Sequence, residues 1–197
     1  MSPCLKSMSD LEVLGILVGR RNAVQLLREA GGSLSELLHE AEVSKEVRPP
    51  AVIKLYAAQE LVKRSLVESM RHRDVLESPA AARDYLRLII GQRECEVFMA
   101  LFLDNKHRVI APEELFRGTL SQASVYPREV VKRSMALNAA AVIFAHNHPS
   151  GVAEPNHADE AITQALRSAL ALLDVRVLDH LVVAGNEIVS FAERGLL

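Results

Sequence analysis

A seven-residue apolar segment, AAAVIFA at residues 139–145, leads directly into the polar sequence HNHPSG at residues 146–151. A short, continuous apolar run is typical of a strand that is buried on both faces of a sheet in an α/β protein. Two histidines at positions i and i+2 of a strand end can project to the same side. The segment therefore predicts a buried strand with a pair of imidazoles at its end.

The rest of residues 76–197 alternates between helix and strand patterns. Apolar residues at helical spacing predict helices over residues 81–90, 127–137 and 158–173. Shorter apolar runs predict strands over residues 96–103 and 107–111, and a hairpin formed by residues 175–184 and 187–191. This order predicts an α/β domain with a mixed sheet.

The first part of the chain, residues 1–75, is expected to be a small all-helical region. Helical spacing of apolar residues extends over residues 10–70, interrupted by Gly31-Gly32 and by Pro49-Pro50. Ser33 is expected to cap the helix after the glycines, and a last helix is expected over residues 51–70. Ser78-Pro79 then has the form of a helix start, with serine as the N-cap and proline at the first helical position. We therefore expect a linker near residues 72–79.

Composition and charge exclude several classes of protein. No run of 18 apolar residues is present, and the first ten residues lack the apolar core of a signal peptide. The two cysteines are too few for a disulfide framework. A net charge of −2 gives no support to binding nucleic acid through a broad basic face. These features lead us to expect a cytoplasmic protein with no membrane association.

The polar residues after the buried strand are candidate metal ligands. His146 and His148 are followed eleven positions later by Asp159, in the first turn of the next expected helix. Two histidines, one carboxylate and an open fourth position form the catalytic zinc pattern. Taken singly, Asp159 also fits a carboxylate that stabilises a helix N-terminus, and Asn156 fits an ordinary N-cap. The combination favours one zinc ion bound by the two histidines and Asp159.

HNHPSG followed by Asp159 resembles the JAMM (MPN+) metalloprotease motif, and specifically the RadC family. The resemblance extends over residues 80–197 through the segments FLDNKHRVI, LFRGTL, VYPREVVKRSMALNAAAVIFAHNHPSG, RVLDHLVV and VSFAERG. It implies a cytidine-deaminase-like α/β fold, a zinc ion and hydrolase or metallopeptidase activity. The family's association with DNA repair belongs to its name rather than to the chemistry of the site.

The resemblance also implies two further site residues. JAMM proteins place a glutamate at the start of the first core strand, which here corresponds to Glu96, with Glu94 as the competing position. Its role would be that of a general base, which takes a proton from the attacking water and delivers it to the leaving amine. JAMM sites carry a serine three residues before the aspartate, where this chain has Asn156. The asparagine amide can donate a hydrogen bond to an oxyanion in place of the serine.

Other residues near the motif receive simpler interpretations. His157 is a possible competing ligand, but its direction on the helix is expected to differ from that of Asp159 by about 100°. His180 is interpreted as a packed histidine that supports the sheet. Cys95 is expected to lie on the opposite face from Glu96, because side chains alternate along a strand.

Three functions remain open from the sequence. The first is a zinc hydrolase that cleaves a peptide or isopeptide bond of a protein substrate. The second is an accessory protein of DNA repair or recombination, and the third is a scaffold that keeps zinc for structure. The second is weakened because the stretch matching the family's helix-hairpin-helix, residues 44–51, has no glycine and contains two prolines. We expect at most weak, salt-sensitive DNA binding from it, and the sequence assigns neither a substrate nor an oligomeric state.

Two similar motifs are excluded. HNH nucleases disperse their His, Asn and His over a ββα unit, whereas here these residues are consecutive. Zinc deaminases require His-x-Glu and Pro-Cys-x-x-Cys, and this chain contains neither sequence.

Overall fold

A computed structural model describes residues 5–43, 49–118 and 125–197. The chain forms two compact units, residues 1–64 and 65–197. The expected division after residue 75 falls later, between α4 (Pro50–His72) and α5 (Pro79–Ile90). No helix in the described ranges is both long enough and apolar enough to span a membrane.

The first unit is helical, as its sequence pattern predicts. Its elements are η1 (Leu5–Ser7), α1 (Asp10–Val18), α2 (Arg20–Glu29), α3 (Leu34–Val43) and the first part of α4. Small apolar residues of these helices form a separate core that includes Leu14, Ala23 and Leu55. Gly31 and Gly32 end α2 with positive φ angles, and the Ser33 hydroxyl accepts the backbone N–H of Glu36 at the start of α3. The expected helix stop and cap are both confirmed.

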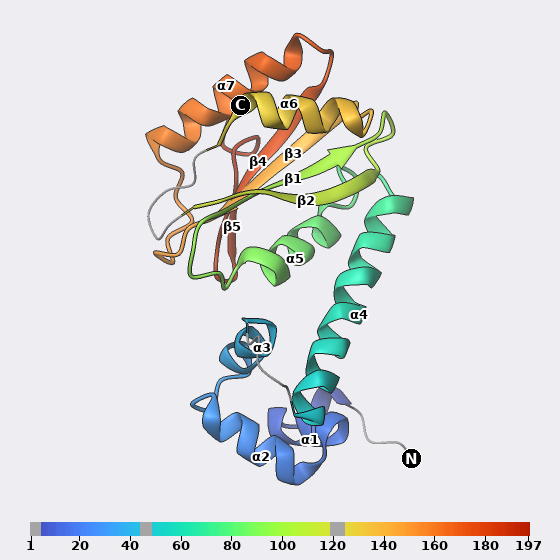
Figure 1. Cartoon of the computed structure of the whole chain (residues 1–197), viewed down its shortest axis with the longest axis vertical. Coiled ribbons are helices and arrows are strands. Elements are labelled where there is room, and N and C mark those ends of the chain that lie inside the picture. Colours follow the sequence, from blue (N-terminus) through green and yellow to red (C-terminus); the bar gives the residue numbers. More distant parts are fainter. Residues whose placement is uncertain (1–4, 44–48, 119–124) are drawn as a thin grey trace. The chain divides into compact units, whose positions relative to one another are not determined.

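The second unit is built on a five-stranded mixed sheet in the order β2-β1-β3-β4-β5 (Figure 1). Its strands are β1 (Val97–Leu103), β2 (Val109–Arg117), β3 (Ala141–Asn147), β4 (Arg176–Ala184) and β5 (Glu187–Ser190). Strand β1 is antiparallel to both β2 and β3, β3 is parallel to β4, and β4 is antiparallel to β5. Every residue of β3 is buried, as the apolar run predicts for a strand covered on both faces.

Helices cover both faces of this sheet and create two cores. Helix α5 packs on one face, where Leu86 and Ile90 join a cluster with alternate residues of β1 such as Met99. Helices α6 (Pro127–Ala136) and α7 (His157–Ala171) lie on the other face (Figure 1). There Val130 and Leu166 pack against the intervening residues of β1, β3 and β4. The period-two alternation of the strands therefore decides which side chains can meet α7.

The structure corrects two expectations about the elements. The second strand runs over Val109–Arg117 instead of residues 107–111, because it pairs with the whole length of β1. His107 has a positive φ of 55° and belongs to the preceding turn, whereas Pro112 is tolerated because β2 is an edge strand. Helix α5 begins at Pro79 as expected, but the Ser78 side chain makes no capping hydrogen bond. Of the stretch that matches the family's helix-hairpin-helix, residues 44–51, residues 44–48 lie outside the described residues.

Candidate metal centre

The three candidate ligands come from the end of β3 and the start of α7. His146 lies within β3 opposite Phe98 of β1 and is fully buried, whereas His148 follows the strand and keeps 14% of its side chain exposed. Asp159 occupies the third position of α7, where a capping box with Asn156 holds it. The backbone N–H of Asn156 donates to Asp159 Oδ2 at 2.8 Å, so the carboxylate orientation is set by the helix start itself.

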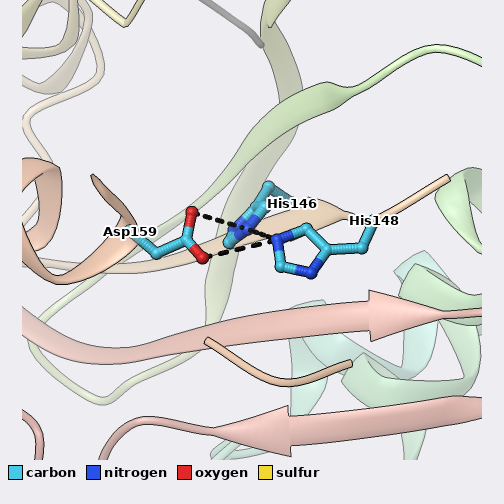
Figure 2. Close-up of side chains that lie close together, drawn as sticks. All are labelled: His146, His148 and Asp159. Carbon is cyan, nitrogen blue, oxygen red and sulfur yellow. Dashed lines mark hydrogen bonds and ion pairs between the residues drawn. The ribbon is translucent and has the colours of Figure 1, made fainter. Parts of the chain in front are cut away.

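The ligand atoms of these residues face a common point (Figure 2). His146 Nε2 lies 2.9 Å from His148 Nε2, 3.2 Å separates His146 Nε2 from Asp159 Oδ1, and 3.3 Å separates His148 Nε2 from Asp159 Oδ2. Ligands at the usual zinc distances of 2.0–2.2 Å in a tetrahedral arrangement would be separated by about 3.3 Å. The two imidazole nitrogens, and each nitrogen with the nearer oxygen of the Asp159 carboxylate, lie at about this spacing, which fits a tetrahedral ion with one further position.

The hydrogen bonding of His148 decides which of its nitrogens can bind a metal. His148 Nδ1 lies 2.9 Å from the carbonyl oxygen of Val152. A carbonyl only accepts hydrogen bonds, so Nδ1 carries the proton and a neutral ring leaves Nε2 with its lone pair. That lone pair, His146 Nε2 and the Asp159 carboxylate then converge as acceptors, an arrangement that a cation stabilises. The donor set of two imidazoles and one carboxylate fits zinc.

In the metal-free site, His148 and Asp159 shift each other's pKa values. The hydrogen bond with Asp159 raises the pKa of His148, which burial opposes and the nearby Glu96 carboxylate reinforces. Burial alone would raise the pKa of Asp159, but the close approach of the His146 and His148 rings, which attract the carboxylate when they are protonated, holds its pKa far below its usual range. Asp159 is therefore a carboxylate throughout the physiological pH range, as a metal ligand must be.

Asn156 and His157 lie at the start of α7. Asn156 Oδ1 accepts the backbone N–H groups of Ala158 at 2.8 Å and Asp159 at 3.1 Å, so it is the N-cap of the helix. The simple N-cap interpretation of the sequence is thus confirmed, and no partner for the amide nitrogen Nδ2 is found among the described residues. His157 is exposed at the first position of the helix and does not belong to the cluster of candidate ligands found among the described residues.

Glu96 lies on the same face of the sheet as the ligands. It directly precedes β1, and alternation places it on the face of Phe98, whose ring lies beside that of His146 at a centroid distance of 6.4 Å. The β1–β3 register begins with Phe98 opposite His146, and the Glu96 carboxylate two residues before Phe98 lies near enough to His148 to raise the pKa of that histidine. Glu96 is partly buried, whereas Glu94 is exposed and Cys95 packs into the core on the other face. The expected placement of Cys95 is confirmed.

Two residues around the candidate ligands were not predicted from the sequence as part of the site. Asn147, between the two histidines, is buried and hydrogen-bonds to the backbone before β1. His180 was interpreted as a packing residue, but its Nε2 lies 2.8 Å from His146 Nδ1, and burial lowers its pKa well below the usual value. A polar residue inside the apolar strand RVLDHLVV was the available signal. Its relation to His146 depends on β4 being the parallel neighbour of β3.

A mixed α/β sheet that brings a His-x-His pair together with a carboxylate from the following helix defines a JAB-type domain. The model of the RadC-like JAB domain family matches residues 76–196. A UPF0758 protein of Nitrosomonas eutropha is 52% identical over 96% of this chain and 90% of the relative. A UPF0758 protein of Methylibium petroleiphilum is 54% identical over 97% of the chain and 91% of the relative. The chain belongs to the RadC-like JAB domain family.

Proposed function

We propose that the protein is a zinc-dependent metallohydrolase that cleaves a peptide or isopeptide bond in a protein or peptide substrate. The observation that supports it is the convergence of two imidazole nitrogens and a carboxylate within 3.3 Å of one another, beside a glutamate that does not itself join them. Three protein ligands leave a fourth position open, as in catalytic rather than structural zinc sites. His148, the partly exposed ligand, marks the side from which a substrate would enter.

Each residue of the centre has a separate task in this proposal. Zinc bound there would polarise the scissile carbonyl and lower the pKa of a coordinated water to about 7. Glu96 would take the proton of the attacking water and return it to the leaving amine. Its position near His148, outside the ligand cluster, suits a base that must approach the reacting atoms without binding the metal.

Asn156 would assist at the oxyanion that develops on the substrate carbonyl. Its Oδ1 is committed to the helix cap, so the amide plane is held and Nδ2 is the group free to donate. Among the described residues, Nδ2 has no protein hydrogen-bond partner. A held donor beside the ligand carboxylate is the type of group that stabilises developing negative charge.

The proposal is tested by elemental analysis of purified protein together with a cleavage screen. The screen would present linear peptides, isopeptide-linked peptides and nucleic acids to the parent protein and to Glu96→Gln. Zinc at about one per chain with cleavage of an amide bond by the parent alone supports the proposal. Zinc without cleavage of any amide substrate would instead support a zinc-bearing scaffold, and cleavage of nucleic acid alone would overturn the assigned bond class.

A further inference from the structure

His180 links two elements of the metal centre through its two ring nitrogens. Its side chain is completely buried, with Nε2 2.8 Å from His146 Nδ1 and Nδ1 2.6 Å from the hydroxyl oxygen of Thr163. Aromatic rings enclose it, with centroid distances of 4.9 Å to Phe191 and 5.5 Å to Phe98. Each nitrogen of the buried ring therefore depends on one polar partner, His146 on one side and Thr163 on the other.

The hydrogen bonds run from Asp159 through Thr163 and His180 to His146, and the bond at Asp159 decides where each hydrogen atom lies. The hydroxyl oxygen of Thr163 lies 2.5 Å from the carbonyl oxygen of Asp159, one helical turn earlier in α7. A carbonyl oxygen carries no hydrogen, and two oxygens this close require a proton between them, so Thr163 donates to Asp159. The single hydroxyl hydrogen is then used, and Thr163 can only accept from His180. The proton of the neutral His180 ring therefore lies on Nδ1.

The same reasoning extends to the metal ligand. With its proton on Nδ1, His180 presents Nε2 as an acceptor, and within the described part of the chain His146 Nδ1 is the one group placed to donate to it. His146 must then carry its proton on Nδ1, which leaves its Nε2 bare. Nε2 is the atom that faces His148 and Asp159.

We propose that Thr163 and His180 are positioning residues that hold His146 in the tautomer whose Nε2 lone pair faces the metal. The inference rests on the proposed zinc centre, but it concerns the preorganisation of one ligand rather than catalysis. Helix α7 would thus serve the centre twice, because it supplies Asp159 as a ligand and, one turn later, Thr163 as the origin of the hydrogen-bond chain. Partners of this kind raise the affinity of a metal site by orienting its ligands.

Paired substitutions of Thr163 separate the hydroxyl from the volume of the side chain. In Thr163→Val the hydroxyl is lost at nearly constant shape, and His180 Nδ1 faces a methyl group instead of an acceptor. The His180 proton then favours Nε2, which forces the His146 proton onto its own Nε2, the ligand atom. We expect zinc affinity, measured by competition with a chelator, to fall about 10–100-fold in Thr163→Val, and Thr163→Ser to stay close to the parent.

Ser134→Ala is the matched control for loss of a buried helix hydroxyl. The Ser134 hydroxyl donates to the Val130 carbonyl in α6, as Thr163 donates in α7, but it contacts no histidine. The Ser134→Ala variant should bind zinc as tightly as the parent protein. If Thr163→Val binds zinc as tightly as Ser134→Ala does, or if Thr163→Ser weakens binding as much as Thr163→Val, the inference is wrong.

Nitrogen-15 NMR of histidine-labelled, metal-free protein reads the tautomer directly and requires no variant. When its ring is neutral, His146 should show a proton on Nδ1 and none on Nε2. A proton on His146 Nε2 in the parent would overturn the inference. Failure of the parent to bind zinc would count against the proposed function, whereas the NMR result would still decide the tautomer.

Discussion

The side-chain oxygen of Asn147 accepts the backbone N–H of Val97 at 2.8 Å, across 50 positions of sequence. The same amide donates through Nδ2 to the carbonyl oxygens of Arg93 and Cys95, each at 3.1 Å. The residue between the two candidate histidine ligands therefore holds the backbone on both sides of Glu96. This connection fixes the distance between the candidate base and the metal centre from within the sheet.

Asn147→Ala should destabilise the protein by roughly 2–4 kcal/mol, because one buried and two partly buried hydrogen bonds to the backbone are lost at once. The free energy of unfolding from denaturant titration measures this loss. Asn105→Ala, in the exposed turn after β1, is the control and should change stability by less than about 0.5 kcal/mol. A cost under about 1 kcal/mol for Asn147→Ala would mean that the backbone before β1 does not depend on this amide.

The double variant His146→Ala/His148→Ala should bind no zinc, whereas the parent should hold about one ion per chain. Removal of two of three ligands leaves a single carboxylate, which is insufficient for a stable site. Elemental analysis after dialysis measures the ratio. His157→Ala, which removes an exposed histidine of the same region, should keep the parental zinc content. Equal zinc in the double variant and the parent would refute the assigned ligands.

Glu96→Gln should keep the zinc and the fold, but its rate should fall about 10²–10⁴-fold, which is the usual contribution of a positioned general base. The measurement is kcat on whichever substrate the cleavage screen identifies, with zinc content determined in parallel. Glu94→Gln is the control, because Glu94 is exposed two residues earlier. If Glu96→Gln cleaves as fast as the parent while Glu94→Gln does not, the roles of the two glutamates are the reverse of those proposed.

Asn156→Ala should cost about 1 kcal/mol of stability, because the N-cap of α7 is lost, whereas Asn156→Ser should retain the cap. Both variants should keep zinc, since Asn156 is not among the ligands. Asn156→Ser should hold or raise the hydrolysis rate if the amide replaces a hydroxyl at the oxyanion. Thermal or denaturant unfolding tests the cap, and equal destabilisation by alanine and serine would contradict it.

Zinc binding should weaken as the pH falls, because zinc requires neutral His148. The contact with Asp159 raises the pKa of His148 above its usual value of 6.5, so proton competition begins above that pH in the metal-free protein. Below the raised pKa the apparent zinc affinity should fall by up to about tenfold per pH unit. Zinc titrations at a series of pH values measure this slope. A zinc affinity that does not change between pH 8 and pH 6 would contradict the coupling.

The stability of the metal-free protein should show the opposite trend. A raised histidine pKa adds stability that is fully present below 6.5 and is lost as the pH rises through the folded-state value. The lowered pKa of Asp159 adds stability that is present above its usual value of 3.8 and is lost as the pH falls below it. The gain in Tm on adding zinc should therefore be larger at pH 8 than at pH 6, as differential scanning calorimetry of both forms would show.

The sequence by itself predicted the buried strand, the helices around it and the three candidate ligands that the structure brings together. These features are encoded locally: the run AAAVIFA specifies a strand covered on both faces, and Asp159 follows a helix-start residue. Glu96 came instead from family resemblance, because no local pattern connects a glutamate to histidines about 50 positions later. The expected end of the second strand failed because its length depends on pairing with β1.

Only the tertiary structure decided which polar residues meet the ligands. The order β2-β1-β3-β4-β5 places β1 on one side of β3 and β4 on the other. The antiparallel pairing of β1 with β3 lets Asn147 hold the backbone on both sides of Glu96. The parallel pairing of β3 with β4 brings His180 to His146. Strand order and register are set by the packing of whole elements, and a shift of one residue moves every side chain to the other face. The ligands can therefore be recognised in the sequence, whereas the groups that orient them become visible only in the assembled sheet.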